Sequence, residues 1–321
     1  MPAHAPGAPD PDASAGPGVL DLVASVLVTG SGDRVWQVPD GWQQGRGCWG
    51  GLVVGALVRA ALDHVGPEAE SLRLRHLSAH LLAPVPPGPA RVVAEVLRRG
   101  SATTTVQARL VGVEAGADGG PSPERGTDTV LAQAVLVLGR TRDVGSADGP
   151  AWRHLEPPAS LAAGWRDLAA PVVGPPLAPV FAPHLQFRPI AGIPTQGDPA
   201  GRVEGWIAAR GPLLAPTATA ERRLTAADVE VYLAMIVDAW WPPVLVQLDA
   251  MRPVATIGSV LDLPGELPPA DLVDAAGAAV PLAFRARPVA ARGGYATESR
   301  ELWTESGTLV ALNTQTMVVI R

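Results

Sequence analysis

Three polar residues in the C-terminal half of the sequence stand in otherwise apolar segments. Asp238 lies in VYLAMIVDAWWPP, Thr256 in VATIGSV and Gln315 in LVALNTQTMVV. A buried carboxylate is costly unless it is paired or has a chemical role, and a buried amide must find hydrogen-bond partners. Burial also raises the pKa of an aspartate above its ordinary value of about 3.9, which makes it a better base at neutral pH. A base, a hydroxyl and an amide together are enough to hold and deprotonate a water molecule.

The element that must position Asp238 is a buried helix over residues 225–241. Thr225 is placed as its N-cap, Asp228 follows three residues later, and a Pro-Pro pair comes after its last turn. From Val231 to Trp241 every residue is apolar or aromatic except Asp238, which is typical of a helix buried on all sides. Because the helix dipole also disfavours a negative charge in the last turn, Asp238 is a local conflict of the kind that concentrates at functional sites. The alternative is a structural aspartate paired with backbone N–H groups or an arginine.

A glycine-rich segment, GRGCWG at 45–50, matches the pattern G-x-G-x-x-G. A dinucleotide site needs an apolar strand directly before this pattern and a parallel βαβ unit around it. Here PDGWQQ precedes it and segments of alternating polarity follow. We therefore interpret the glycines as allowing close backbone approach at the N-terminus of a helix, where free N–H groups can polarise a carbonyl.

Other candidate nucleophiles and ligands are weaker. The sequence lacks G-x-S-x-G, H-E-x-x-H and a carboxylate cluster with metal-ligand spacing, so we expect neither a metal nor another cofactor. His76, Ser78 and His80 share one face of a strand, but neighbouring side chains on a strand diverge, and we interpret the histidines as core or rim residues. Cys48 precedes a helix, yet no histidine is near it in the sequence to make it a nucleophile.

The elements around these residues follow the same order in both halves of the chain, a helix and then four strands with a period of two. The strands of the first half are LRHLSAHLLAPV, ARVVAEVLRRG, TTTVQARLVGV and TVLAQAVLVLG, and those of the second are VATIGSVLDL, PLAFRARPVA, YATESRELWT and LVALNTQTMVVI. This repetition indicates an internal duplication. It predicts an α+β fold, the double hotdog, in which each of two long helices is wrapped by an antiparallel sheet. Asp238, Thr256 and Gln315 would then come from elements that pack on one another.

The predicted organisation has four parts, separated by changes in composition. They are a disordered tail at 1–18, an N-terminal hotdog repeat at 19–140, a linker between the repeats at 141–175, and a C-terminal hotdog repeat at 176–321 that carries the candidate catalytic residues.

Composition excludes several classes of function. Net charge is −6 and the basic residues, all arginines, are scattered, which argues against nucleic-acid binding. No apolar run approaches the roughly 20 residues of a membrane span, and the N-terminus does not have the pattern of a signal peptide. A single cysteine excludes an internal disulfide, so we expect a cytoplasmic location.

The same motifs resemble the acyl-CoA thioesterase II (TesB-like) family of double-hotdog enzymes, over about residues 36–139 and 176–321. The resemblance lies in GRGCWGGLVVGAL, HLSAHLLAPVPPG and VLRRGSATTTVQARL, and in VDAWWPPVL, VATIGSV and ELWTESGTLVALNTQ. Members of that family use an Asp, a Thr and a Gln to hold the attacking water. The resemblance implies these roles for Asp238, Thr256 and Gln315. Because the first half has no such triplet, it also implies one active site per chain.

The resemblance further implies an acyl thioester hydrolase that acts on acyl-CoA or on an acyl carrier protein, in fatty acid or polyketide metabolism. We expect an apolar tunnel for the acyl chain, and substrate contacts from Gly50, Gly51, His80, Trp240 and Trp241. Arginines at the rim could meet the phosphates of the carrier, and the candidates are Arg98, Arg99 and Arg292.

Two other interpretations stay open at this stage. In one, a hotdog enzyme carries out dehydration, hydration or isomerisation of an acyl thioester, and Asp238 moves a substrate proton. In the other, the protein binds acyl ligands or an enzyme partner without catalysis. Since hotdog proteins often associate through their sheets, we also expect a homo-oligomer.

Overall fold

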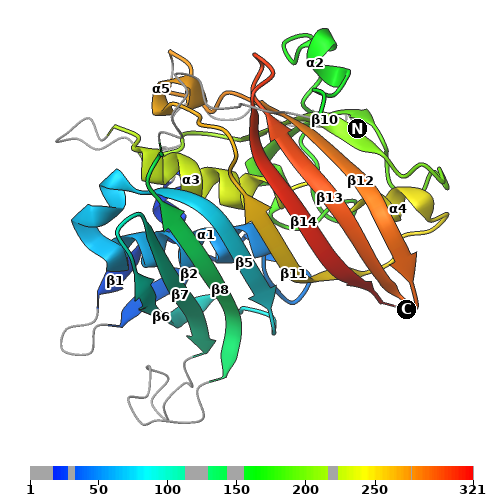
Figure 1. The fold of residues 1–321 in the computed structure, drawn as a ribbon. Coiled ribbons are helices and arrows are strands. Elements are labelled where there is room, and N and C mark those ends of the chain that lie inside the picture. Colours follow the sequence, from blue (N-terminus) through cyan, green and yellow to red (C-terminus); the bar gives the residue numbers. More distant parts are fainter. Residues whose placement is uncertain are drawn as a thin grey trace, which may run out of the picture.

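One antiparallel sheet of twelve strands runs through both halves of the chain (Figure 1). The structure, a computed structural model, describes residues 17–27, 33–112, 129–142, 155–215, 223–275 and 277–320. In these residues the strand order is β1-β2-β6-β7-β8-β5-β11-β14-β13-β12-β10-β9. β5 and β11 meet at the centre, and corresponding strands of the two halves follow outward in the same order. The halves are therefore related by an approximate two-fold axis, which confirms the predicted double hotdog.

The bounds of the elements agree with the repeating order that the sequence predicts. The first half contains β1 (Ser25–Leu27), β2 (Arg34–Val38), α1 (Gly50–Val65), β5 (Arg73–Leu81), β6 (Gly88–Arg99), β7 (Thr103–Gly112) and β8 (Val130–Gly139). The second half contains β9 (Leu185–Ala191), β10 (Val203–Ala209), α3 (Ala226–Ile236), β11 (Val254–Asp262), β12 (Leu282–Arg292), β13 (Tyr295–Trp303) and β14 (Leu309–Val319). Short helices α2 (Ser160–Ala163), α4 (Pro243–Gln247) and α5 (Pro269–Leu272) lie between strands.

The helices α1 and α3 pack against each other and lie on one face of the sheet (Figure 1). Their close crossing depends on glycines, because a Cβ at Gly55 would lie 2.4 Å from Met235 Cγ and one at Gly51 would lie 2.5 Å from the Met235 carbonyl oxygen. The helices run antiparallel, so the start of α1 meets the end of α3. This crossing brings the glycine-rich segment of the first half next to Asp238 of the second.

The N-terminal end of α3 has the predicted cap. Thr225 accepts a hydrogen bond from the Asp228 backbone N–H, and the Asp228 side chain accepts one from the Thr225 N–H, which is a capping box. The C-terminal end differs from the prediction, because α3 ends at Ile236 and not at Trp241. The Pro-Pro pair does not follow the last turn directly: Pro242 precedes α4 and Pro243 is its first residue, where a proline needs no N–H partner.

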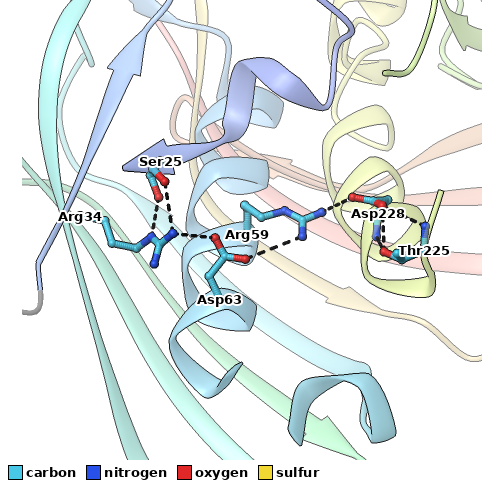
Figure 2. A network of polar contacts seen from close by, with 6 residues as sticks. All are labelled: Ser25, Arg34, Arg59, Asp63, Thr225 and Asp228. Carbon is cyan, nitrogen blue, oxygen red and sulfur yellow. Dashed lines mark hydrogen bonds and ion pairs between the residues drawn. The ribbon is translucent and has the colours of Figure 1, made fainter. Parts of the chain in front are cut away.

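An ion-pair network joins the N-terminal end of α3 to α1 and β2 (Figure 2). Arg34 lies 3.1 Å from Asp63 and hydrogen-bonds to Ser25, and Arg59 pairs with both Asp63 and Asp228. Each carboxylate of this network has a guanidinium partner. With two arginines and two aspartates, the network is neutral overall, and its ion pairs hold the end of α1 against the start of α3.

Parts of the predicted tail and linker belong to the packed structure. The tail was predicted over 1–18, of which 1–16 lie outside the described residues, while the Gly18 N–H donates to Asp21. Within the predicted linker, 143–154 lie outside the described residues, as does the whole of 114–128, a polar segment that the sequence predicts to be a loop between two strands. The following residues Leu155, Leu161 and Trp165 pack against the buried side chains of Trp206 and Trp303. No described helix is long and apolar enough to cross a membrane.

Candidate active site

Asp238 lies just beyond the end of α3, against the first turn of α1. Its Oδ2 atom is so close to α1 that a Cβ at Gly50 would lie 3.0 Å from it. The turn after Val237 therefore directs the carboxylate across to the other half of the molecule. Its side chain is 14% exposed, because a cavity opens beside it.

The three predicted residues form one hydrogen-bonded chain. Gln315 Nε2 donates to Asp238 Oδ1 at 2.8 Å, and Thr256 Oγ1 donates to Gln315 Oε1 at 3.3 Å. Strand register explains the second contact: β11 pairs with β14, and a bulge between Thr256 and Gly258 shifts Thr256 relative to its partner strand. The convergence that the sequence predicts is thus present in the fold.

A buried arginine and glutamate, which the sequence analysis missed, complete the polar cluster. Arg300 Nη1 lies 3.8 Å from Asp238 Oδ1 and donates to the Val237 carbonyl oxygen at 3.1 Å. Arg300 Nε donates to Glu298 Oε1 at 2.5 Å, and both side chains are 2% exposed. Glu298 and Arg300 lie two residues apart on β13, on the face that alternation assigns to the core. Two charged residues at core positions of a strand were the signal that could have found them.

The electrostatics of this cluster favour proton uptake by its carboxylates. Burial raises the pKa of Asp238 above its ordinary value, while Arg300, the Gln315 amide and the Gly51 backbone N–H act in the opposite direction. Burial likewise raises the pKa of Glu298, Arg300 lowers it, and the Asp238 charge raises it further. One guanidinium thus serves two buried carboxylates. The cluster carries an excess of acid that a purely structural ion pair would not need.

A cavity of about 300 Å³ opens beside Asp238, Thr256 and Arg300. Trp240 and Trp241, both predicted to contact the substrate, line it together with Phe181 and Phe187. The rings of Phe187, Trp240 and Trp241 contact one another, with the Trp240 and Trp241 centroids 4.7 Å apart in an edge-on arrangement. The remaining wall is mostly aliphatic and comes from the segments on either side of β9, from α4, from the loop after α4 and from the start of β11. It includes Val173, Leu177, Ala178, Pro194, Leu245, Met251 and Val254.

The predicted glycines lie at the site, but the N–H of one of them faces the carboxylate. Gly50 and Gly51 begin α1, and the Gly51 N–H is among the groups that lower the pKa of Asp238. This N–H group is therefore directed at Asp238, and polarisation of a substrate carbonyl by the start of α1 stays a prediction. The G-x-G-x-x-G segment at 45–50 supplies the turn and the second strand of an antiparallel hairpin, β3 (Gln43–Gln44) and β4 (Gly47–Cys48), and then enters α1 at Gly50. It is not part of a βαβ unit.

His80 and the predicted rim arginines lie elsewhere. His80 is exposed, and β5 alternation places it on the face opposite Ala79 and Leu81, so it lines neither cavity beside Asp238. Arg98, Arg99 and Arg292 are exposed and do not line the 300 Å³ cavity. The exposed arginine that lines it is Arg252, which the sequence analysis did not single out.

The alternative nucleophiles have no support from the geometry. Burial raises the pKa of the Cys48 thiol to about 12, so the thiol stays protonated at neutral pH. His76 pairs with Asp262 at 2.8 Å, and both are partly exposed. Among the described residues, no group of three or more His, Cys, Asp or Glu side chains is arranged to hold a metal ion.

Comparison with known proteins gives two family matches in tandem. The acyl-CoA thioesterase N-terminal domain matches residues 38–138, and the acyl-CoA thioesterase C-terminal domain matches residues 155–319. Together these matches cover most of the chain. No curated protein matches the chain in a search of its sequence.

Solved structures share the fold along nearly the whole chain. A hot-dog-fold protein of Alicyclobacillus acidocaldarius has a TM-score of 0.68 at 20% identity, covering 94% of this chain and 98% of its own. An acyl-CoA thioesterase II of Mycobacterium marinum has a TM-score of 0.62 at 15% identity, with coverage of 94% and 98%. The tesB protein of Mycobacterium avium subspecies paratuberculosis has a TM-score of 0.60 at 16% identity and the same coverage. At these identities the likeness shows the fold alone.

Proposed function

The chain belongs to the acyl-CoA thioesterase family, and we propose that it hydrolyses acyl thioesters with Asp238 as the general base. Thioester hydrolysis follows from the family, and the roles of individual residues are our proposal. The observation that carries it is the chain Thr256–Gln315–Asp238, which ends in a carboxylate of raised pKa beside an apolar cavity. A carboxylate whose pKa has moved towards neutrality is a more effective base than an ordinary aspartate.

In the proposed reaction, a water molecule beside Asp238, Thr256 and Gln315 attacks the thioester carbonyl carbon. Asp238 accepts a proton from this water as its oxygen bonds to carbon. The carbon–sulfur bond then breaks, and the proton held by Asp238 passes to the leaving sulfur, so that a carboxylic acid and a thiol are released. Arg300 limits the rise of the Asp238 pKa, which keeps the carboxylate available as a base.

The shape and lining of the cavity favour a compact acyl group. Its volume of about 300 Å³ is at the small end of the range for ligand pockets. Four aromatic side chains line it; the rings of Phe187, Trp240 and Trp241 contact one another, and that of Phe181 stacks on Trp49. We therefore propose short or aromatic acyl groups as substrates, with the acyl group against Trp240 and Trp241.

Arg252 supports coenzyme A or a phosphopantetheine arm as the carrier. Its exposed guanidinium is the charged group at the mouth of the cavity, where the phosphates of a bound carrier would reach solvent. Guanidinium groups bind phosphates through paired hydrogen bonds. Arg252 therefore replaces the three arginines that the sequence suggested for this role.

The test is release of free thiol from a panel of acyl-CoAs, from acetyl to long-chain and including benzoyl and phenylacetyl, with the Asp238→Asn variant alongside. We expect release to be fastest with the short or aromatic members and to be lost in the variant. The Asp238→Asn change preserves size and the hydrogen-bonding shape of the side chain, so a retained thermal unfolding transition separates lost chemistry from lost fold.

Two outcomes would contradict the proposal. Full thiol release by Asp238→Asn would remove Asp238 as the base. No release from any acyl-CoA by the folded wild-type protein would remove hydrolysis of acyl-CoA, and the same panel on an acyl carrier protein would then identify the carrier.

A further inference from the structure

A second, much smaller void lies next to Asp238. Its volume is about 10 Å³, roughly the space that one buried water needs. It shares Asp238 and Thr256 with the 300 Å³ cavity, and its other walls are core residues of α1, α3, β5, β11 and β14. These two residues therefore stand between the void and the cavity. Gly50 forms part of its wall, and a Cβ there would lie 2.9 Å from Leu81 Cδ1 and 3.0 Å from Asp238 Oδ2.

Asn313 brings an unpartnered oxygen to this void. The residue lines the void and is 1% exposed, and its Oδ1 has no hydrogen-bond partner among the residues that the structure describes. The orientation of its amide is fixed, because Nδ2 donates to Ser259 Oγ and to the Val260 carbonyl oxygen, both at 2.8 Å. A buried amide oxygen without a partner carries its full desolvation penalty, so a donor for it is strongly favoured.

We propose that the void binds one water molecule that links Asn313 Oδ1 to the Asp238 carboxylate, which makes Asn313 a positioning residue for the catalytic base. One hydrogen of the water is donated to Asn313 Oδ1 and the other to Asp238. The Ser259 hydroxyl, which accepts from Asn313, can donate its own hydrogen to the same water. Three partners are the usual number for a buried water. This water is separate from the attacking water, which must lie in the cavity with the substrate.

The proposed water acts on the protonation of Asp238. A donor to a carboxylate favours its charged form and lowers its pKa, in opposition to burial. Three other groups face Asp238 directly: Arg300 on β13, Gln315 on β14 and the Gly51 N–H on α1. Glu298 on β13 acts on Asp238 by its charge and by its pairing with Arg300. The Trp49 indole also approaches the carboxylate without meeting hydrogen-bond geometry. All of these are retained when Asn313 is replaced, so a change in the Asp238 pKa reports on the water.

The catalytic part of this inference rests on the proposed function. The water link itself can be tested without enzyme activity, through the pKa of Asp238. The variants are Asn313→Leu, whose larger apolar side chain takes up the void and offers a water no partner, and Asn313→Ala, which enlarges the void. The pKa of Asp238 is measured in each by NMR titration of its labelled carboxyl carbon, assigned with Asp238→Asn. The acidic limb of kcat/KM against pH is recorded in parallel, and the wild-type crystal structure is examined for an ordered water.

We expect the Asp238 pKa to rise by about one unit in Asn313→Leu, the size of one lost hydrogen bond to a charged group. Because the enlarged void of Asn313→Ala admits water that still donates to Asp238, the rise is smaller in that variant. The acidic limb of kcat/KM moves to higher pH in the same order.

The opposite order would overturn the proposal, because loss of packing alone makes Asn313→Ala the more disturbed variant. An unchanged titration in Asn313→Leu, or a wild-type crystal structure without water in the void, would also overturn it. If the titrations follow the expected order while no acyl thioester is hydrolysed, the water link stands and the proposed function falls.

Discussion

The two ends of the α1–α3 pair differ in how their carboxylates are paired with arginines. At one end, Arg34 and Arg59 meet Asp63 and Asp228, two positive charges against two negative (Figure 2). At the other end, the single guanidinium of Arg300 meets two carboxylates, and a cavity opens beside one of them. The first end resembles a structural clamp. The second keeps an excess of buried carboxylate, which is costly for stability and useful for moving a proton.

The approximate two-fold symmetry makes this comparison direct. Each helix presents an aspartate near its end, Asp63 on α1 and Asp238 just beyond α3. Asp63 is held by two arginines, whereas Asp238 is held by a neutral amide at 2.8 Å and by one arginine at 3.8 Å. The Asp238 side chain is also the less exposed of the two, 14% against 29% for Asp63. Deeper burial and weaker pairing with cations together separate the candidate catalytic end from the structural end.

The largest expected effect comes from matched substitutions at the two ends, Asp238→Asn and Asp228→Asn. We expect Asp238→Asn to lower kcat by about 10²–10⁴-fold, the usual contribution of a general base, with its fold retained. Asp228→Asn breaks the ion pair with Arg59 and should lower the free energy of unfolding while kcat stays close to wild type. Thiol-release kinetics and urea unfolding of both variants check this. Equal losses of kcat would mean that the two ends do not differ in function.

A smaller effect is expected from removing the cation at each end. Arg300→Met leaves Asp238 and Glu298 without their guanidinium and should cost about 3–5 kcal/mol of unfolding free energy at neutral pH. Arg59→Met should cost less, about 1–3 kcal/mol, because Asp63 keeps Arg34 and Asp228 keeps the Thr225 N–H and hydroxyl.

The pH dependence of these losses distinguishes the two ends further. Because the folded-state pKa values of Asp238 and Glu298 are raised, their destabilising contribution is absent below the unfolded pKa of about 4 and grows as pH rises through the folded values. Without Arg300 the folded values rise further, so the loss in Arg300→Met should increase from pH 5 to pH 8. Urea unfolding at both pH values measures it, and a loss independent of pH would contradict the proposed electrostatics.

The smallest expected effect is that of Glu298→Gln, which sharpens the charge argument. This change removes a negative charge that competes with Asp238 for Arg300. The pKa of Asp238 should therefore fall, and the acidic limb of kcat/KM should move to lower pH by less than about one unit. Since Gln keeps the size of Glu298, packing is conserved. An acidic limb that moves to higher pH would contradict this argument. It would show that the negative charge of Glu298 is needed to hold Arg300 beside Asp238.

Local sequence patterns predicted much of this protein. The alternation of strand residues, the capping box at Thr225 and Asp228, and the repeated order of one helix and four strands gave the double hotdog. Asp238 was identifiable because a lone carboxylate in an apolar helix is a local conflict. The end of α3 was placed five residues too late, because an apolar run does not show where a helix gives way to a turn.

Only the tertiary structure decided which residues meet Asp238. The crossing of α1 over α3 brings Gly50 and Gly51 to the carboxylate, and the register of β13 and β14 places Glu298 opposite Gln315 and Arg300 opposite Asn313. A shift of one residue in a strand turns each of its side chains to the other face, so register cannot be read from composition. The sequence by itself thus determined the elements and the candidate base. The charge balance, the cavity and the water-sized void depend on contacts between segments far apart in the chain.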